Sequence, residues 1–185
     1  MSEQTPERPY PVGSDEKVNR VMVYTSNAIY WGDVVAKEAV RVSTWLRTNS
    51  APEFLRIYQA RCIVPTAGAT PRPLLYTEIY IPATEIRAYH LMAPDKDPLD
   101  YDPTEPNRRM DPVSVVVGTF RIDGHLRVSA ISNLGKYLEI TREAYTPLYD
   151  VEITNLIMPA LGVMKTYYIQ VRQSTGLFGI LPQTA

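Results

Sequence analysis

Two stretches of sequence decide the fold: VYTSNAIYWGDVVAKEAVRVSTWLRTNS at residues 23–50 and VVVGTFRIDGHLRVSAISNLGKYLEITR at residues 115–142. They can be laid over one another without a gap, and they agree in pattern more than in identity. Gly32 meets Gly124, and apolar residues meet apolar residues at most other positions that a fold would bury. Such a repeat predicts one structural unit that is present twice in the chain.

The first part of each stretch has the pattern of a half-buried strand. In the second copy the apolar face is formed by Ile122, Gly124, Leu126 and Val128, with polar or charged residues between them. The first copy places Trp31 among its outward residues. Because successive side chains of a strand point to opposite sides, this alternation predicts a strand with one buried face. A short turn precedes each strand and predicts a hairpin. Glycine in mid-strand often marks a bulge or a sharp bend, and both glycines are interpreted as barrel corners.

The period changes farther along each stretch. The apolar residues Val42, Trp45 and Leu46 in the first copy, and Leu134, Tyr137 and Leu138 in the second, have the spacing i, i+3, i+4. This spacing is typical of a short helix with one apolar side, and the agreement of both copies favours it over a continued strand. Ser43 and Asn133 lie near the predicted helix starts and are candidate N-caps.

Two further strands follow in each copy. FLRIYQARCIVP at residues 54–65 lies over LYDVEITNLIMP at residues 148–159, and both end in proline. TEIYI at residues 77–81 then lies over KTYYI at residues 165–169. A last short strand is expected near the end of each copy. Five short strands in so small a unit favour closure into a barrel, which removes the sheet edges.

The sequence therefore predicts a mainly β chain of two tandem small five-stranded β-barrels, each with a short helical segment. The expected divisions are a disordered arm at 1–18, a first barrel at 19–92, a proline-rich and acidic linker at 93–112 and a second barrel at 113–185. The linker has no hydrophobic period, and its prolines favour an extended, stiff segment.

The first copy resembles an uncharacterised family of small bacterial barrel domains. The resemblance is carried by Gly32, Arg41-Val42-Ser43, Leu46, Phe54-Leu55, Ile57 and Ala60. This chain has Thr44 and Arg47 where that family has Asp and Asn. The strand layout is also similar to that of Sm-like barrels. The resemblance implies a fold and no established activity, and the short Asp/Asn loop pattern with which Sm-like proteins bind RNA is not found.

Composition narrows the function classes. The formal net charge of −1 gives no field that would steer a polyanion, which disfavours nucleic acid as a partner. A single cysteine excludes an internal disulfide and fits a reducing compartment. The sequence has neither an apolar run long enough to span a bilayer nor an apolar core in its N-terminal region, so the expected location is the cytoplasm, away from membranes.

The sequence shows no constellation that predicts catalysis. It lacks the glycine-rich loops that bind nucleotides, and one cysteine with two histidines is too few for a Cys/His zinc site, so neither a cofactor nor a metal is expected. Cys62 lies in an apolar strand and is interpreted as a buried structural thiol. His125 beside Asp123 could act as a base, but a solvated strand face is the favoured interpretation. We expect a protein that is not an enzyme.

The outward aromatic residues Trp31, Tyr80 and Tyr168 are the candidate interface residues, because aromatic side chains are enriched at protein interfaces. Cover by the arm, the linker or the other barrel is the alternative explanation. The sequence predicts a non-enzymatic protein-interaction or assembly module: a pseudo-twofold pair of barrels that associates further with itself. The alternative function is a nucleic-acid or small-ligand binding module of the Sm-like type.

Overall fold

The structure, a computed structural model, describes residues 9–48 and 50–181 and is mainly β. Its ten strands pair antiparallel in one sheet. The strands of the first half are β1 (Glu16–Tyr24), β2 (Ile29–Lys37), β3 (Phe54–Ile63), β4 (Leu74–Pro82) and β5 (Ala88–Leu91). Those of the second half are β6 (Arg108–Val117), β7 (Phe120–Ser129), β8 (Tyr145–Asn155), β9 (Met164–Arg172) and β10 (Leu177–Gly179). The helical segments are the α-helix α1 (Leu134–Ile140) and the 3-10 helices η1 (Val42–Arg47), η2 (Ala83–Glu85) and η3 (Pro159–Leu161).

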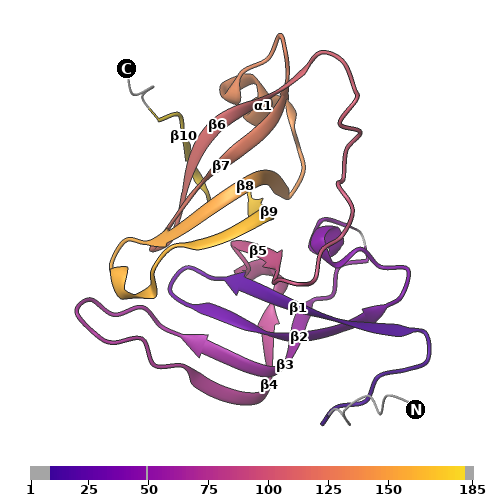
Figure 1. The fold of residues 1–185 in the computed structure, drawn as a ribbon, viewed down its shortest axis with the longest axis vertical. Coiled ribbons are helices and arrows are strands. Elements are labelled where there is room, and N and C mark those ends of the chain that lie inside the picture. The colour runs from indigo at the N-terminus through magenta and orange to yellow at the C-terminus, as the bar shows by residue number, and fades with distance from the viewer. Residues whose placement is uncertain (1–8, 49, 182–185) are drawn as a thin grey trace.

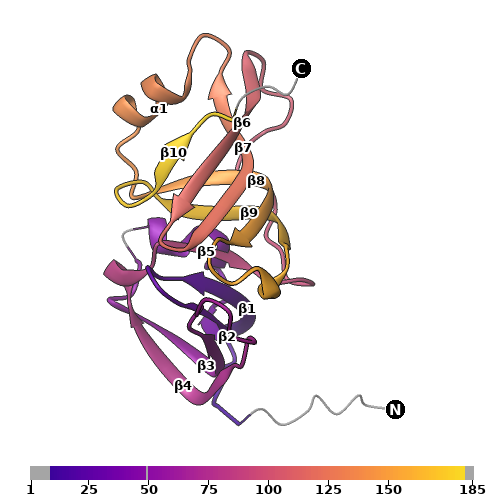
Figure 2. The ribbon, with the colours of Figure 1, turned by 90° about the vertical axis from the view of Figure 1, so that its left-hand side faces the viewer.

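Both halves have the same strand order. The sheet runs β10-β6-β7-β8-β9-β5-β1-β2-β3-β4, so in each half the fifth strand lies beside the first, followed by the second, third and fourth. Figures 1 and 2 show the halves as two lobes that meet where β5 and β9 lie side by side. A pseudo-twofold axis would pair equivalent strands. Because β5 is a fifth strand and β9 a fourth, the expected pseudo-twofold arrangement is wrong.

Separate closure of the two halves is not seen in the strand pairing. Within the described residues, β4 pairs with β3 alone and β10 with β6 alone, so the ten strands form one open sheet. The strand expected to close the first barrel, β5, pairs with β9 across the two halves. Each half therefore leaves one strand edge free, β4 at one end of the sheet and β10 at the other.

The predicted hairpins are confirmed, and a bulge lies at each mid-strand glycine, where the sequence predicts the corner of a closed barrel. β1 pairs with β2, and β6 with β7, through short turns. The register of β2 against β3 shifts at Gly32, and that of β7 against β8 shifts at Gly124. On the facing strands, Gln59 and Asp150 have φ values of 46° and 49°. A Cβ on Gly32 would lie 2.5 Å from the carbonyl oxygen of Tyr58, so glycine allows the strands to approach at this bulge.

Helical segments form at both predicted places. The side chain of Asn133 accepts a hydrogen bond of 3.0 Å from the backbone N of Lys136, so it caps α1 as expected. The expected cap at Ser43 is wrong. Ser43 lies inside η1, the helix follows Arg41, and the backbone N of Ser43 donates to Asp97 of the linker at 2.9 Å.

Two clusters of buried apolar side chains form the core, and each reaches across the junction. The larger cluster is centred in the second half but includes Tyr24, Ile29 and Ala88 of the first. The smaller cluster belongs to the first half but includes Tyr145 of the second. The two halves therefore share apolar packing, which favours one cooperative unit over two independent domains.

Part of the expected disordered arm is ordered. The ring of Tyr10 stacks on that of Tyr58 with centroids 4.4 Å apart, and its hydroxyl donates to Asp33 at 2.8 Å. β1 begins at Glu16, inside the stretch expected to be disordered. The prediction fails here because one buried aromatic ring is enough to fix a short polar segment. The rest of that prediction, residues 1–8, lies outside the described residues.

The linker is shorter than expected, because β6 already begins at Arg108. It runs along one side of the molecule from the first lobe to the second (Figure 1). Asp97 contacts the first half through Ser43, as described above, and its carbonyl oxygen accepts a hydrogen bond of 3.1 Å from Tyr167 of the second half. Asp97 thus attaches the linker to the first lobe through its carboxylate and to the second through its backbone carbonyl group.

Candidate interaction surface at the edges of the sheet

The two halves are joined by the pairing of β5, the fifth strand of the first half, with β9, the fourth strand of the second. Ala88 of β5 lies opposite Val171 of β9, and Tyr89 lies opposite Gln170. All four residues are buried. The backbone N of Arg172 donates to the carbonyl oxygen of Arg87 at 2.7 Å and extends the pairing by one step. The junction is therefore as fully buried as the core of either half.

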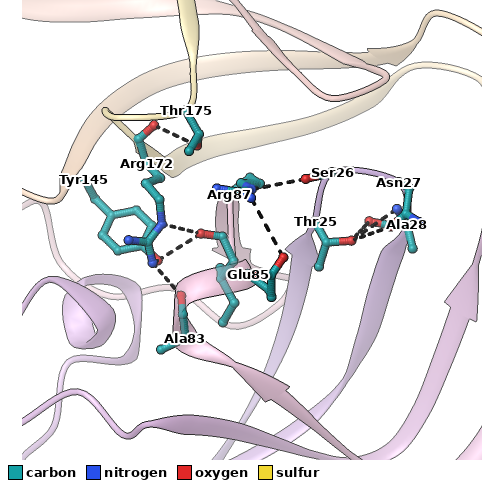
Figure 3. Close-up of polar contacts among 11 residues, drawn as sticks. Thr25, Ser26, Asn27, Ala28, Ala83, Glu85, Arg87, Tyr145, Arg172 and Thr175 are labelled. Carbon is teal, nitrogen blue, oxygen red and sulfur yellow. Dashed lines mark hydrogen bonds and ion pairs between the residues drawn. The ribbon is translucent and has the colours of Figure 1, made fainter.

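Arg172 fastens the two halves at this junction (Figure 3). Its Nε donates to the carbonyl oxygen of Ile86 at 2.8 Å, and its guanidinium also donates to the hydroxyl of Tyr145 at 2.7 Å and to the carbonyl oxygen of Ala83. Burial raises the pKa of Tyr145 above its usual range, although Arg172 opposes the shift. The hydroxyl therefore keeps its proton at neutral pH and donates to Ile86 at 3.2 Å.

The hairpin turns of the two halves also touch. Gly118, in the turn between β6 and β7, has a φ of 56°, and a Cβ there would lie 2.1 Å from the carbonyl oxygen of Ser26. Ser26 lies in the turn between β1 and β2 and accepts a hydrogen bond of 3.2 Å from Arg87 (Figure 3). A side chain at position 118 would separate the turns, so the close approach depends on glycine.

The two free edges carry large apolar side chains in solvent. On the β4 side these are Phe54, Leu74, Leu75, Tyr76 and Tyr80. On the β10 side they are Leu177, Ile180 and Leu181. A strand edge offers unpaired backbone N–H and C=O groups to another strand, and exposed apolar residues beside it favour such an addition.

The structure places the three predicted interface residues in different surroundings. Tyr80 is exposed on the β4 edge, as expected. Trp31 is partly covered and packs against the larger core cluster, which contains residues of both halves. Tyr168 lies on the outer face of β9, opposite to the side on which Ile169 enters the core, but this outer position is covered, which is the alternative explanation. Tyr168 is buried, and its hydroxyl donates to Asp100 of the linker at 2.8 Å, so the linker covers this face.

The side chains considered for catalysis do not form a site. Cys62 is buried, and burial raises the pKa of its thiol. His125 lies on an outer strand position beside Asp123, and its Nδ1 is buried without a hydrogen-bond partner. In the described part of the chain, no group of three or more His, Cys, Asp or Glu side chains could hold a metal ion. The candidate functional surface is therefore formed by the strand edges.

Two of the open grooves on the surface of the described residues are considered for ligand binding. The larger, about 610 Å³, is lined by Arg20, Trp31, Arg61 and Tyr76 among others, and it adjoins the β4 edge. The smaller, about 400 Å³, lies where the halves meet and is lined in part by His90, Lys96 and Lys165.

Comparisons with protein-family models, with curated proteins and with solved structures found no match. Over residues 9–48 and 50–181, no helix combines the length and the apolar character needed to cross a membrane.

Proposed function

We propose that this chain is a non-enzymatic assembly or protein-interaction module. It consists of two Sm-like five-stranded units that act through their free strand edges. The tandem organisation is supported by the shared strand order of the two halves and by a helical segment between the second and third strands of each. The observation that carries the proposal is the large apolar side chains exposed along both β4 and β10.

Strand addition explains why these edges are apolar. Proteins that do not use their edge strands protect them with charges, prolines or short strands. β4 has nine residues, and its first three, Leu74, Leu75 and Tyr76, are all exposed and apolar. An incoming strand would gain main-chain hydrogen bonds from the edge and specificity from alternate side chains.

A peptide selection tests the proposal. The bait is the variant Leu177→Lys, which places a charge on the β10 edge and leaves β4 as the apolar edge. Short displayed peptides are selected on it, and hydrogen exchange maps where they bind. We expect peptides with alternating apolar residues that slow amide exchange in β4. The matched control is the same protein carrying Tyr80→Lys in addition, which should lose them. Failure to select peptides, or protection away from β4, contradicts the proposal.

A second candidate is binding of single-stranded nucleic acid or a small aromatic anion in the larger groove. Trp31 and Tyr76 offer ring faces there, and Arg20 and Arg61 offer positive charge. Asp33, which forms an ion pair with Arg20 at 3.2 Å, and the net charge of −1 weigh against it. Titration with single-stranded RNA at low salt, followed by tryptophan fluorescence, tests this candidate. Salt-sensitive binding that is weakened by Arg61→Ala and unchanged by Arg121→Ala supports it, and absence of binding contradicts it.

A further inference from the structure

The strand registers within each half identify which residues of the two halves are equivalent. Beyond the bulges, Asp33 lies opposite Tyr58 in the first half, and His125 lies opposite Tyr149 in the second. Tyr58 in turn lies opposite Glu78, and Tyr149 lies opposite Tyr168. Counting along β4 and β9 from these pairs makes Tyr80 equivalent to Gln170 and Ile81 equivalent to Val171.

The fifth strands can be matched in the same way. Val23 of β1 lies opposite Tyr89 of β5, and Val115 of β6 lies opposite Phe178 of β10. Phe178 is therefore equivalent to Tyr89, and Leu177 is equivalent to Ala88. Phe54 is equivalent to Tyr145, because they lie opposite Pro82 and Arg172 at the ends of β4 and β9.

Three positions that are buried at the internal junction hold exposed apolar residues at the free edges. Gln170 is 0 % exposed, whereas Tyr80 is 51 % exposed. Ala88 is 0 % exposed and Leu177 is 72 % exposed. Tyr145 is 1 % exposed and Phe54 is 51 % exposed. If no further unit paired with these edges, we would expect polar residues on them, as on the outer faces of the terminal repeats of repeat proteins.

We infer that the edges bind each other in separate copies of this chain: β4 of one copy pairs antiparallel with β10 of the next, in the register of β9 with β5. Ile81 then lies opposite Leu177, and Tyr80 lies opposite Phe178. Phe54 of the first copy meets Phe178 of the second, as Tyr145 meets Tyr89 within the chain with ring centroids 5.5 Å apart. The inference rests on the proposed function, because it names a second copy as the partner that adds the strand.

The pairing is head to tail, because β4 and β10 are different strands. Each copy presents both edges, so addition continues until a ring closes or a filament forms. The outer junction is weaker than the inner one. Pro82 occupies the place of Arg172, so it supplies neither the guanidinium clasp nor the backbone N–H that Arg172 donates to Arg87. Assembly should therefore depend on concentration.

Sedimentation of the full chain, with its single-edge variants, tests the inference. The wild-type protein should exceed its monomer mass of 20.9 kDa as concentration rises. Tyr80→Lys blocks the β4 edge and Leu177→Lys blocks the β10 edge, so each variant alone should remain a monomer. An equal mixture of the two should form a one-to-one dimer, since each variant keeps the edge that the other lacks.

The controls separate the edge effect from other causes. Ile131→Lys changes a side chain that is 92 % exposed in the turn before α1, away from both edges, and should assemble as the wild type does. Phe54→Lys is a second variant on the β4 side and should replace Tyr80→Lys in the mixture. Far-UV circular dichroism checks that each variant is folded, which is expected because every changed side chain is exposed.

Three outcomes overturn the inference. A wild-type chain that remains a monomer at all concentrations excludes the pairing. Dimers of Leu177→Lys alone indicate β4 pairing with β4, and a mixture that stays monomeric excludes β4 with β10. If peptides are still captured on β4 in any of these cases, the proposed function stands and the choice of partner is wrong.

Discussion

The two bulge glycines differ in how closely the facing strand approaches them. A Cβ on Gly32 would lie 2.5 Å from the Tyr58 carbonyl oxygen and 2.7 Å from Cγ2 of Ile57. A Cβ on Gly124 would meet Cγ2 of Val151 at 3.0 Å and the Tyr149 carbonyl oxygen at 3.1 Å. Rigid backbone is the closest obstacle in the first case, and a side-chain methyl is the closest in the second.

We therefore expect Gly32→Ala to destabilise the chain more than Gly124→Ala. Overpacking of a strand interior costs about 1–3 kcal/mol, and Gly32→Ala should lie at the upper end of this range and Gly124→Ala at the lower. Urea unfolding of the two variants, compared with wild type, gives the difference in free energy of unfolding. Equal losses for the two would show that the backbone at Gly32 relaxes.

His90 is a buried, neutral histidine in β5. Its Nδ1 donates to the carbonyl oxygen of Leu91 at 2.8 Å, because a carbonyl can only accept. Its Nε2 therefore lacks a proton and accepts from the hydroxyl of Tyr24 at 3.2 Å. Burial lowers the pKa of His90 from 6.5 to about 4, and the bond to Leu91 opposes the shift only in part. These two contacts keep His90 in the neutral tautomer that carries its proton on Nδ1.

This histidine should make the stability of the chain sensitive to acid. Above pH 6.5 it is neutral in both the folded and the unfolded chain. Below pH 6.5 the unfolded chain binds a proton that the folded chain does not, so stability falls until the pH reaches about 4. The loss over this window is on the order of 3 kcal/mol.

Urea unfolding of wild type and His90→Gln at pH 7 and pH 4.5 isolates this contribution. Glutamine does not titrate, so the variant should lose less stability between the two pH values. The carboxylates of the chain titrate in both proteins and cancel in the comparison. The same loss in both proteins would show that His90 binds its proton in the folded chain.

At the scale of the elements, the sequence predicts the first two strands of each half better than the later ones. The gapless overlay matches Gly32 with Gly124, and both occupy the bulge. The overlay of the third strands took its register from the prolines at 65 and 159, yet β3 ends at Ile63 and β8 at Asn155. The bulged strands interrupt the period-two pattern, so periodicity alone does not detect the slip.

The overlay of the fourth strands pairs Tyr168 with Tyr80, whereas the strand register makes Tyr168 the counterpart of Glu78. A shift of two residues leaves a side chain on the same face, so it does not change the outward placement of Tyr168. The polar cover over Tyr168 comes from Asp100 in the linker, far away in the sequence. The overlay also missed Phe54 and Leu177 as edge residues. Their equivalence to Tyr145 and Ala88 can be recognised only when the strands are aligned in the register that follows the bulges.

The linker should depend on Asp100 more than on its other acidic residues. Asp100 accepts hydrogen bonds from Tyr149 at 2.6 Å and from Tyr168 at 2.8 Å. Burial raises the pKa of both tyrosines, so both remain donors. Asp100→Ala would leave two part-buried hydroxyl groups without an acceptor, at a cost of about 1–3 kcal/mol each.

Limited proteolysis tests this role, because loss of these contacts should release the linker from the second half. Asp100→Ala should be cut within residues 93–107 faster than wild type. Asp102→Ala is the matched control, since its carboxylate bonds only to Thr104 two residues away in the described structure. Equal cleavage of the two variants would show that the remaining linker contacts, such as those of Asp97, hold it without Asp100.

At the scale of the whole molecule, the junction between the halves is beyond prediction from the repeat. A repeat predicts that the same unit occurs twice, and it leaves open whether each sheet closes on itself or pairs with its neighbour. The choice is made by side chains that differ between the copies. Arg172 has no arginine at its equivalent position, Pro82, and Tyr145 is matched by Phe54, which lacks a hydroxyl.

Arg172 should therefore determine whether the chain unfolds as one unit. It donates to Ile86 and Ala83 of the first half and to Tyr145, whose ring packs in the core of the first half. Arg172→Ala removes these hydrogen bonds from a charged donor, at a cost of about 2–3 kcal/mol. Because the bonds join the two halves, we expect the variant to lose cooperativity as well as stability.

Two spectroscopic signals can detect that loss. Both tryptophans, Trp31 and Trp45, lie in the first half, whereas far-UV circular dichroism follows the strands of both. In wild type the two urea transitions should coincide, and in Arg172→Ala they should separate. Arg121→Ala is the control, because its 3.0 Å ion pair with Asp123 is on the surface of the second half and contributes at most about 1 kcal/mol. Coincident transitions in Arg172→Ala would mean that strand pairing and shared apolar packing are sufficient to couple the halves.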